Sequence, residues 1–206
     1  MKQGIVIATW SGGEEPCSLL MKSIWNIEYP VLVVVNDIQH MPPAWGMKLY
    51  AMTGEQGWHV QGNNYDGYEI GAIESVLKHT DWDEFILLQE SIEIKDQDVF
   101  RLMFEEFPGQ SVAYNPHFQM YLGKYRREVL NRMQLPIVRT KIEAVRQEEI
   151  FAKDYERADG NLKIFNPQFR DEAFYHNWEE MFGRKNLKME DDYIIKRKGT
   201  WSASQL

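Results

Sequence analysis

Short apolar runs alternate with amphipathic segments along the first half of the chain. Buried strands are predicted from the apolar runs at residues 5–8, 31–35 and 84–88, which polar or glycine residues bound, with a weaker strand at 58–61. Apolar positions at helical spacing predict helices over 14–27, 69–79 and 97–107. Strands that alternate with helices at these intervals predict βαβ units. The expected fold class is therefore α/β, with a mostly parallel, Rossmann-like sheet flanked by helices.

The second half of the chain has weaker strand signals. Predicted strands cover 111–114, 120–122 and 192–196, and predicted helices cover 124–133, 141–157 and 169–182. No repeat, low-complexity tract or linker separates the two halves. We therefore expect one domain over residues 1–206, with a helical C-terminal elaboration.

Composition narrows the class of protein. With 44% hydrophobic and 26% charged residues, the chain is neither wholly disordered nor a collagen or coiled coil. A single cysteine, Cys17, excludes an internal disulfide framework and a cysteine-based zinc site. No apolar run approaches the roughly 20 residues that span a bilayer, and no cleavage site follows the first apolar run. We expect a cytoplasmic protein.

Charge is unevenly distributed behind the net value of −8. Residues 66–106 contain twelve acids and three bases, whereas residues 124–146 contain seven bases and two acids. A third stretch, 184–198, has six bases and three acids. Such segregation can steer an anionic partner, although solvated helix faces give the same pattern.

Polar or glycine-containing segments follow each predicted strand of the first half. They are Thr9-Trp10-Ser11-Gly12-Gly13, Asn36-Asp37, Gly62-Asn63-Asn64 and Gln89-Glu90-Ser91. Ligands of open parallel sheets bind beyond the carboxyl ends of the strands. These four segments are therefore the candidate site for a polar ligand.

The order and spacing of these elements resemble a GT-A-fold, family-2-like glycosyltransferase over residues 3–107. The resemblance implies that residues 1–107 bind a nucleotide-sugar donor, with a UDP-sugar the first expectation, and that 108–206 form the acceptor side. Asp37 would recognise the nucleotide base or ribose. Asn63 and Asn64 would lie near the diphosphate, and Thr9, Trp10, Gln89, Glu90 and Ser91 would complete the donor site.

The metal site of the resembled family is altered in this sequence. Glu90 falls where the family carries an Asp-x-Asp motif, so Gln89-Glu90-Ser91 supplies one carboxylate where two are usual. One alternative is a weakly held Mn²⁺ or Mg²⁺ on Glu90, with His176 as a further ligand. The other is a site without metal, in which the tail bases of Arg184–Lys188 and Lys196–Lys198 neutralise the diphosphate; Arg184, Lys185 and Lys198 are the candidates.

An inverting transferase also needs a base for the acceptor hydroxyl, and relatives place that acid at a helix start beyond the sheet. Glu148 and Glu149 are the candidates. Adjacent helical residues point about 100° apart, so one of the two enters the site.

The acceptor side is basic, and compact transferases of this class include bacteriophage enzymes that decorate modified DNA bases. A DNA acceptor would place phosphates against five bases, Arg126, Arg127, Arg132, Arg139 and Lys141. Tyr121, Tyr125 or Trp178 would then stack on a flipped base.

Two other functions share this architecture. A non-catalytic module that binds a nucleotide sugar or a protein would explain Gln89 and Ser91 as decay of the metal motif. A nucleotidyltransferase would carry a basic, glycine-rich loop after the first strand, and Thr9–Gly13 has no base.

Overall fold

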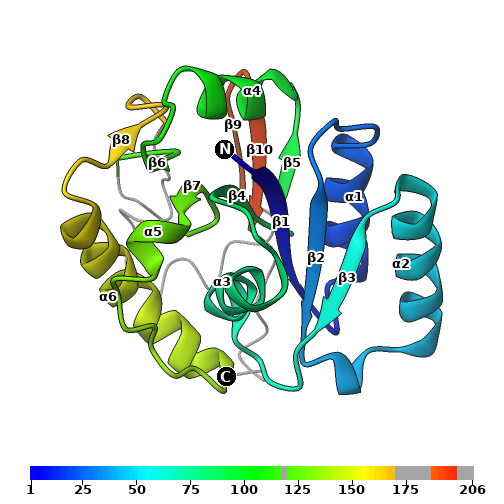
Figure 1. Ribbon diagram of the computed structural model, residues 1–206. Helices are drawn as coiled ribbons and strands as arrows, with labels where there is room; N and C mark the ends of the chain where they lie inside the picture. The colour runs from blue at the N-terminus through cyan, green and yellow to red at the C-terminus, as the bar shows by residue number, and fades with distance from the viewer. Residues whose placement is uncertain (117–119, 170–186, 199–206) are drawn as a thin grey trace.

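A central sheet of seven strands organises the computed structural model, which describes residues 1–116, 120–169 and 187–198 (Figure 1). In spatial order the strands are β3 (His59–Gly62), β2 (Val31–Asn36), β1 (Gln3–Trp10), β4 (Glu84–Gln89), β7 (Leu122–Arg126), β6 (Val112–Ala113) and β8 (Lys163–Ile164). The first four are parallel, β7 is antiparallel to β4 and β6, and β8 is parallel to β6. The expected mostly parallel, Rossmann-like sheet is confirmed.

Helices cover both faces of this sheet because the central strands are apolar on both sides. In β1, Ile5 and Ile7 face one core, and Val6 and Ala8 face the other. The first core is closed by α1 (Glu14–Ser23), α2 (Pro43–Gln56) and α4 (Asp98–Glu105). The second is closed by α3 (Tyr68–His79), α5 (Arg127–Leu130) and α6 (Lys141–Asp159). A short 3-10 helix, η1 (Ile38–His40), follows β2.

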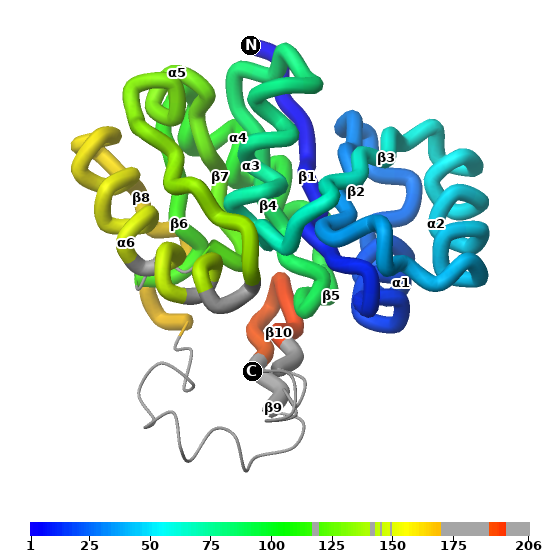
Figure 2. Tube along the Cα trace, turned by 90° about the horizontal axis from the view of Figure 1, so that it is seen from below, coloured from blue at the N-terminus to red at the C-terminus, as the bar shows by residue number. Residues whose placement is uncertain are grey.

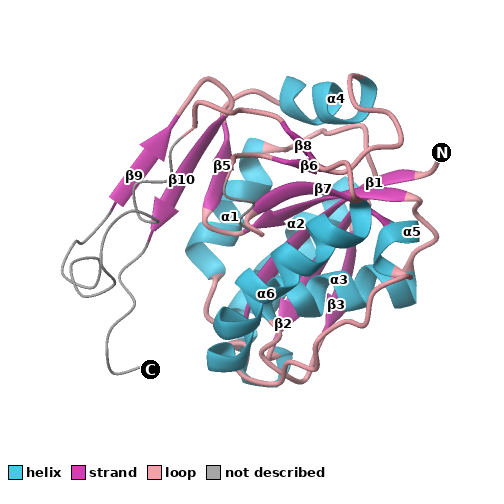
Figure 3. Cartoon of the chain, turned by 90° about the vertical axis from the view of Figure 1, so that its left-hand side faces the viewer, coloured by secondary structure: helices cyan, strands magenta, loops and turns pink. Residues whose placement is uncertain are grey.

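A second, antiparallel sheet extends from the carboxyl end of β4. Its strands are β5 (Ile92–Ile94), β10 (Ile194–Lys198) and β9 (Leu187–Glu190), with β10 in the middle. β5 begins three residues after β4 ends, so this small sheet is tied directly to the segment Glu90-Ser91. Figure 3 shows β9 and β10 extending from one side of the main body.

Some predicted elements differ from those of the structure. The predicted basic helix at 124–133 is wrong over its first residues, because Lys124–Arg126 complete β7 and only Arg127–Leu130 form α5. Helix α2 had no counterpart in the sequence prediction. The predicted helix at 169–182 lies outside the described residues, apart from Phe169.

Helix α6 has clear start and stop signals. Thr140 caps its first turn in a capping box with Glu143, and Gly160 adopts the left-handed conformation (φ 69°) after its last residue. The predicted helix at 141–157 is confirmed within two residues. Within the described residues, no helix combines the length and apolar character needed to cross a membrane.

Candidate functional site

Four parallel strands deliver polar residues to one edge of the sheet. The register pairs Trp10 with Asn36 and Ala8 with Gln89, so the carboxyl ends of β1, β2 and β4 lie side by side. The backbone N–H of Asn63 donates to the carbonyl of β2 residue Val35 at 2.9 Å, which brings the segment after β3 to the same edge. The structure thus brings together the segments that carry Thr9, Trp10, Asp37, Asn63, Asn64, Gln89, Glu90 and Ser91.

Two amide side chains connect α3 to this edge through hydrogen bonds. Asn36 Nδ2 donates to the Tyr68 carbonyl at 3.0 Å. Asn63 Nδ2 donates to Asn36 Oδ1 and to the Gly71 carbonyl, both at 3.2 Å, and Ser75 Oγ donates to Asn63 Oδ1 at 3.2 Å. The Asn63 amide therefore holds the start of α3 in place. Asn64, by contrast, is exposed at the edge.

Asp37 occupies a tight turn after β2. Its backbone adopts the left-handed conformation (φ 57°), which aspartate tolerates better than most residues. Its N–H donates to the Tyr65 carbonyl at 3.0 Å, and its carboxylate contacts His40 Nδ1 at 2.7 Å. The side chain keeps 26% of its surface exposed, so the carboxylate is fixed in direction and accessible from the edge.

A polar cluster of two buried and two half-buried side chains lies at the carboxyl end of β4. We call Glu69, Gln89, Ser91 and Lys196 the Gln89 cluster. Gln89 Nε2 donates to Glu69 Oε1 at 2.5 Å, and Ser91 Oγ donates to Gln89 Oε1 at 2.7 Å. The Lys196 ammonium donates to Gln89 Oε1 and, at 2.5 Å, to Ser91 Oγ. A helix, a strand end and the second sheet therefore converge on one amide.

Lys196 reaches this cluster from β10. The β10–β5 register pairs it with Ile92, the residue after Ser91, and Figure 2 shows β10 alongside β5 at the end of β4. Its Nζ lies 4.4 Å from the centre of the Tyr121 ring, and the residue is 3% exposed. The ammonium is therefore buried between an aromatic face and two side-chain oxygens.

The electrostatics of the cluster keep Glu69 largely protonated at neutral pH. Burial away from water raises the pKa of Glu69 to about 8, the charges of Glu148 and Glu90 act in the same direction, and Lys196 opposes them. Burial, with Asp66 and Glu90 adding to it, also raises the pKa of the neighbouring Tyr68. A carboxyl in this state is an acid and a hydrogen-bond partner, and it is poorly placed to act as a base at pH 7.

Of the two predicted base candidates, the structure describes the side chain of Glu148 alone. Glu148 projects from α6 towards the sheet edge, where its Oε1 accepts from the Met120 N–H at 3.4 Å. It lies close enough to Glu69 to raise the pKa of that carboxyl. The backbone of Glu149 belongs to α6, but its side chain lies outside the described part.

The expected divalent cation was tested against the donor atoms at this edge. The oxygens of Gln89 and Ser91 that flank Glu90 already accept from an ammonium. Within the described ranges, no group of three or more His, Cys, Asp and Glu side chains is placed to hold a metal ion. His176, the other predicted ligand, lies outside those ranges. In this segment Glu90 therefore supplies one carboxylate, and the two oxygens beside it already accept hydrogen bonds from an ammonium.

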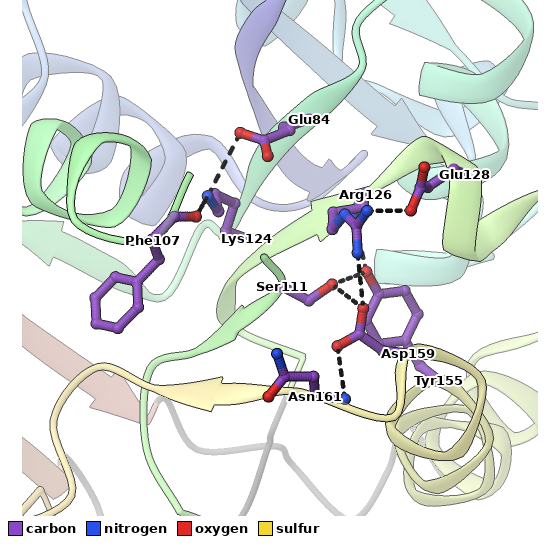
Figure 4. Close-up of polar contacts among 9 residues, drawn as sticks. All are labelled: Glu84, Phe107, Ser111, Lys124, Arg126, Glu128, Tyr155, Asp159 and Asn161. Carbon is purple, nitrogen blue, oxygen red and sulfur yellow. Dashed lines mark hydrogen bonds and ion pairs between the residues drawn. The ribbon is translucent and has the colours of Figure 1, made fainter. Parts of the chain in front are cut away.

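Arg126 and Arg127 lie at the opposite end of the sheet from this edge. The register pairs Arg126 with Glu84, the first residue of β4, and its guanidinium contacts Glu128 and Asp159 (Figure 4). Arg127 donates to the carbonyls at the end of α3 and beyond it, which are those of Val76, Leu77, Thr80 and Trp82. Both side chains therefore have structural roles away from the strand ends.

The other predicted DNA contacts are more dispersed. Arg139 lies beside the edge, with its guanidinium 4.6 Å from the centre of the Tyr65 ring, and Arg132 is exposed on the α5 side. The side chain of Lys141 lies outside the described part. The predicted stacking of Tyr125 on a flipped base is wrong, because its ring is wholly buried against Phe85 and Tyr155.

Several predicted residues cannot be placed. Arg184 and Lys185, the candidates for the diphosphate, and Trp178 lie outside the described residues. Lys198 ends β10, but its side chain is not described. Of the tail bases, Lys196 has a described side chain in the site.

Glu69 was not among the predicted site residues. It counted among the acids of the 66–106 stretch, yet it lies four and seven residues before Ile73 and Val76, which are buried. An acid on the apolar face of a predicted helix is the signal that would have found it. The pairing of Lys196 with Gln89 spans 107 residues and left no local signal.

Comparison with known proteins supports the architecture through structure alone. No family model matches the sequence, and no curated protein matches it. The structure is similar to the mannosyltransferase PcManGT from Pyrobaculum calidifontis, solved with GDP-Man and Mn²⁺, with a TM-score of 0.62 and 10% identity over 81% of this chain. It is also similar to S. aureus TarS 1–349 in complex with UDP-GlcNAc, with a TM-score of 0.59 and 12% identity over 89% of this chain.

A third similar structure has a different chemistry. CMP:2-keto-3-deoxy-manno-octonic acid synthetase complexed with CTP matches 80% of this chain with a TM-score of 0.52 and 16% identity. The match covers 89% of that synthetase, but only 55% of PcManGT and 64% of TarS 1–349. At these identities the likeness concerns the fold and not the reaction. The chain shares its GT-A-type fold with these two transferases and with the synthetase.

Proposed function

We propose that the chain is a glycosyltransferase that moves a sugar from a nucleotide-diphosphate donor, with a UDP-sugar the first candidate, to an acceptor hydroxyl. The observation that carries the proposal is the Gln89 cluster. It sets a buried cation and hydrogen-bonding groups at the end of β4, on the same edge as the accessible Asp37 carboxylate. The similar structures of PcManGT and TarS, solved with GDP-Man and UDP-GlcNAc, support a donor of this class.

The chemistry assigns a role to Glu148. The acceptor oxygen attacks the anomeric carbon, the bond from that carbon to the diphosphate oxygen breaks, and its electron pair leaves with the nucleoside diphosphate. The acceptor proton must pass to a base. Glu148 is our candidate because it lies at the edge, whereas Glu69 holds its own proton at neutral pH. Glu149 stays the alternative.

The candidate acceptor is a base-linked hydroxyl in DNA. Fewer basic residues support it than the sequence predicted. Arg139 beside the edge and the exposed Arg132 are the described cations that support it. Duplex binding that falls steeply between 50 and 200 mM salt, and weakens in Arg139→Ala, is the expected result. Duplex binding that does not weaken as the salt concentration rises would contradict a DNA acceptor. A cytoplasmic setting belongs to the same proposal and rests on the single cysteine, Cys17.

Nucleotidyl transfer is the competing enzymatic reaction, because the fold also resembles the synthetase bound to CTP. The segment after β1 speaks against it, since Trp10–Gly13 carries no lysine or arginine for a triphosphate. Release of diphosphate from CTP or UTP in the presence of a sugar acid would favour that reaction. Release of UDP or GDP from a nucleotide sugar would favour glycosyl transfer.

The deciding experiment is a thermal-shift panel of UDP, GDP, CDP, CTP and the corresponding sugars, followed by product analysis. A ligand at about 100 times its Kd adds roughly 2.7 kcal/mol of stability, which raises the melting temperature measurably. Asp37→Asn should lose the shift, and Asp81→Asn, a surface control, should keep it. Binding without turnover would favour a non-catalytic module. No shift with any nucleotide would overturn the proposal.

A further inference from the structure

The segment Gln89-Glu90-Ser91 binds a side-chain cation of the protein itself, the ammonium group of Lys196. The Lys196 ammonium donates to the side-chain oxygens of Gln89 and Ser91 and is almost fully buried. It is fixed from two further directions. The β10–β5 ladder pairs Lys196 with Ile92, and the Tyr121 ring lies 4.4 Å from its Nζ. Tyr121 is itself tied to the cluster, because its carbonyl accepts from the Gln89 N–H at 2.9 Å.

Burial of this ammonium costs free energy. A lysine ammonium loses its hydration on burial, and its hydrogen bonds to Gln89 and Ser91 compensate part of that loss. The ammonium lies at the carboxyl ends of the strands, where an open sheet binds its ligand.

We infer that the Lys196 ammonium takes the place of the divalent cation in this site, so that donor binding and sugar transfer need no metal. The inference rests on the proposed function. In the transfer step the sugar–oxygen bond to the diphosphate breaks, and the ammonium neutralises the charge that develops on the departing diphosphate oxygen. A dication on the same oxygens would displace Lys196 or be repelled by it. The carbonyl of Gln89 and the hydroxyl of Ser91 orient the ammonium where two carboxylates would otherwise hold a metal.

The first measurement is the Kd of UDP and GDP for the whole chain, by calorimetry, in EDTA and in Mn²⁺ or Mg²⁺. Equal affinity in EDTA and in metal is expected. Lys196→Met should weaken the nucleotide by about 10- to 100-fold, the range of a lost charge-assisted hydrogen bond. Lys196→Arg, which keeps the charge, should recover part of the affinity. Lys95→Met, an exposed lysine beside β5, is the matched control and should bind as the wild type does.

A second variant distinguishes loss of the ammonium from loss of folding. The triple variant Gln89→Asp, Ser91→Asp and Lys196→Met offers carboxylates and removes the ammonium, so its nucleotide affinity should become dependent on Mn²⁺. Circular dichroism and melting curves establish that each variant is folded.

The outcomes separate this inference from the proposed function. A wild-type protein that binds nucleotide only with metal, or a folded Lys196→Met that binds as tightly as the wild type, overturns the inference and leaves glycosyl transfer standing. A wild-type protein that binds no nucleotide in either condition overturns both.

Discussion

Gln89 at the end of β4 and Glu69 in the first turn of α3 are joined by a 2.5 Å hydrogen bond, in which the amide Nε2 donates to the carboxyl. The bond couples the position of a helix to the protonation of a buried acid. Because burial raises the pKa of Glu69 to about 8 from an ordinary value of 4.5, the folded state takes up a proton that the unfolded chain has released.

Glu69 should therefore make the protein less stable as pH rises. Its contribution is complete below about pH 4.5, falls through the window up to about pH 8, and is then lost. Glu69→Gln, which has no such proton to lose, should flatten this slope. Urea unfolding between pH 5 and 8 measures it, with the exposed Glu55→Gln as control. Parallel stability curves for Glu69→Gln and the wild type would show that Glu69 ionises normally.

Two helical glycines should respond in opposite directions to alanine. A Cβ on Gly71 would lie 2.5 Å from Asn36 Oδ1, inside the amide network that fastens α3, whereas a Cβ on Gly54 in α2 meets nothing within 4 Å. Gly71→Ala should destabilise the fold by about 1–3 kcal/mol and weaken nucleotide binding. Gly54→Ala should stabilise it by about 0.5–1 kcal/mol. Thermal unfolding and a nucleotide titration test both, and a neutral Gly71→Ala would mean that the network is not rigid.

The same network shows what the sequence could predict. The unbroken run ending at Val35 identified β2, and the parallel order was predicted from the alternation of strands and helices, although α2, between β2 and β3, was not predicted. The candidate edge followed as well, since strand ends of a parallel sheet share one side. The pairing of Asn36 with Asn63 could not be predicted, because nothing local indicates that the amide at the end of β2 meets the amide that follows β3.

The wrong helix prediction over residues 124–126 is explained by the surroundings of strand β7. Lys124, Arg126 and Arg127 gave its segment the polarity of a solvated helix, yet Lys124 is fully buried. Its partner Glu84 lies 40 residues earlier in the chain, across the β4–β7 ladder. No local pattern predicts a lysine that is buried because a distant acid receives it. Lys196 was among the predicted tail bases, but its pairing with Gln89, 107 residues earlier, also has no local pattern that predicts it.

The Lys124–Glu84 pair should stabilise the fold and have no effect on nucleotide binding. Nζ and Oε2 are 3.4 Å apart in the interior, and Nζ also donates to the Phe107 carbonyl at 2.6 Å (Figure 4). Lys124→Met should cost about 3–5 kcal/mol because it leaves the buried Glu84 without its cation. Lys124→Met with Glu84→Gln should recover much of the loss. Urea unfolding of the two variants measures this.

Nucleotide affinity tests whether the Lys124–Glu84 pair affects the site. Glu84 begins β4 and Gln89 ends it, so folded Lys124→Met should bind nucleotide as the wild type does. Weakened binding in the folded fraction would mean that the pair also shapes the donor site.

Glu148→Gln should separate donor binding from transfer. The substitution keeps an oxygen for the Met120 N–H and removes the basic carboxylate, so kcat should fall by about 10²- to 10⁴-fold while nucleotide affinity stays close to that of the wild type. Loss of its charge should also lower the pKa of Glu69, because Glu148 is one of the charges that raise it. Steady-state transfer from a UDP-sugar, beside Glu156→Gln on the exposed side of α6, measures the first effect. A pH titration of stability measures the second. Wild-type turnover in Glu148→Gln, with the pKa of Glu69 lowered, would place Glu148 in the site as a charge and assign the base to another carboxylate, of which Glu149 is the nearest in sequence.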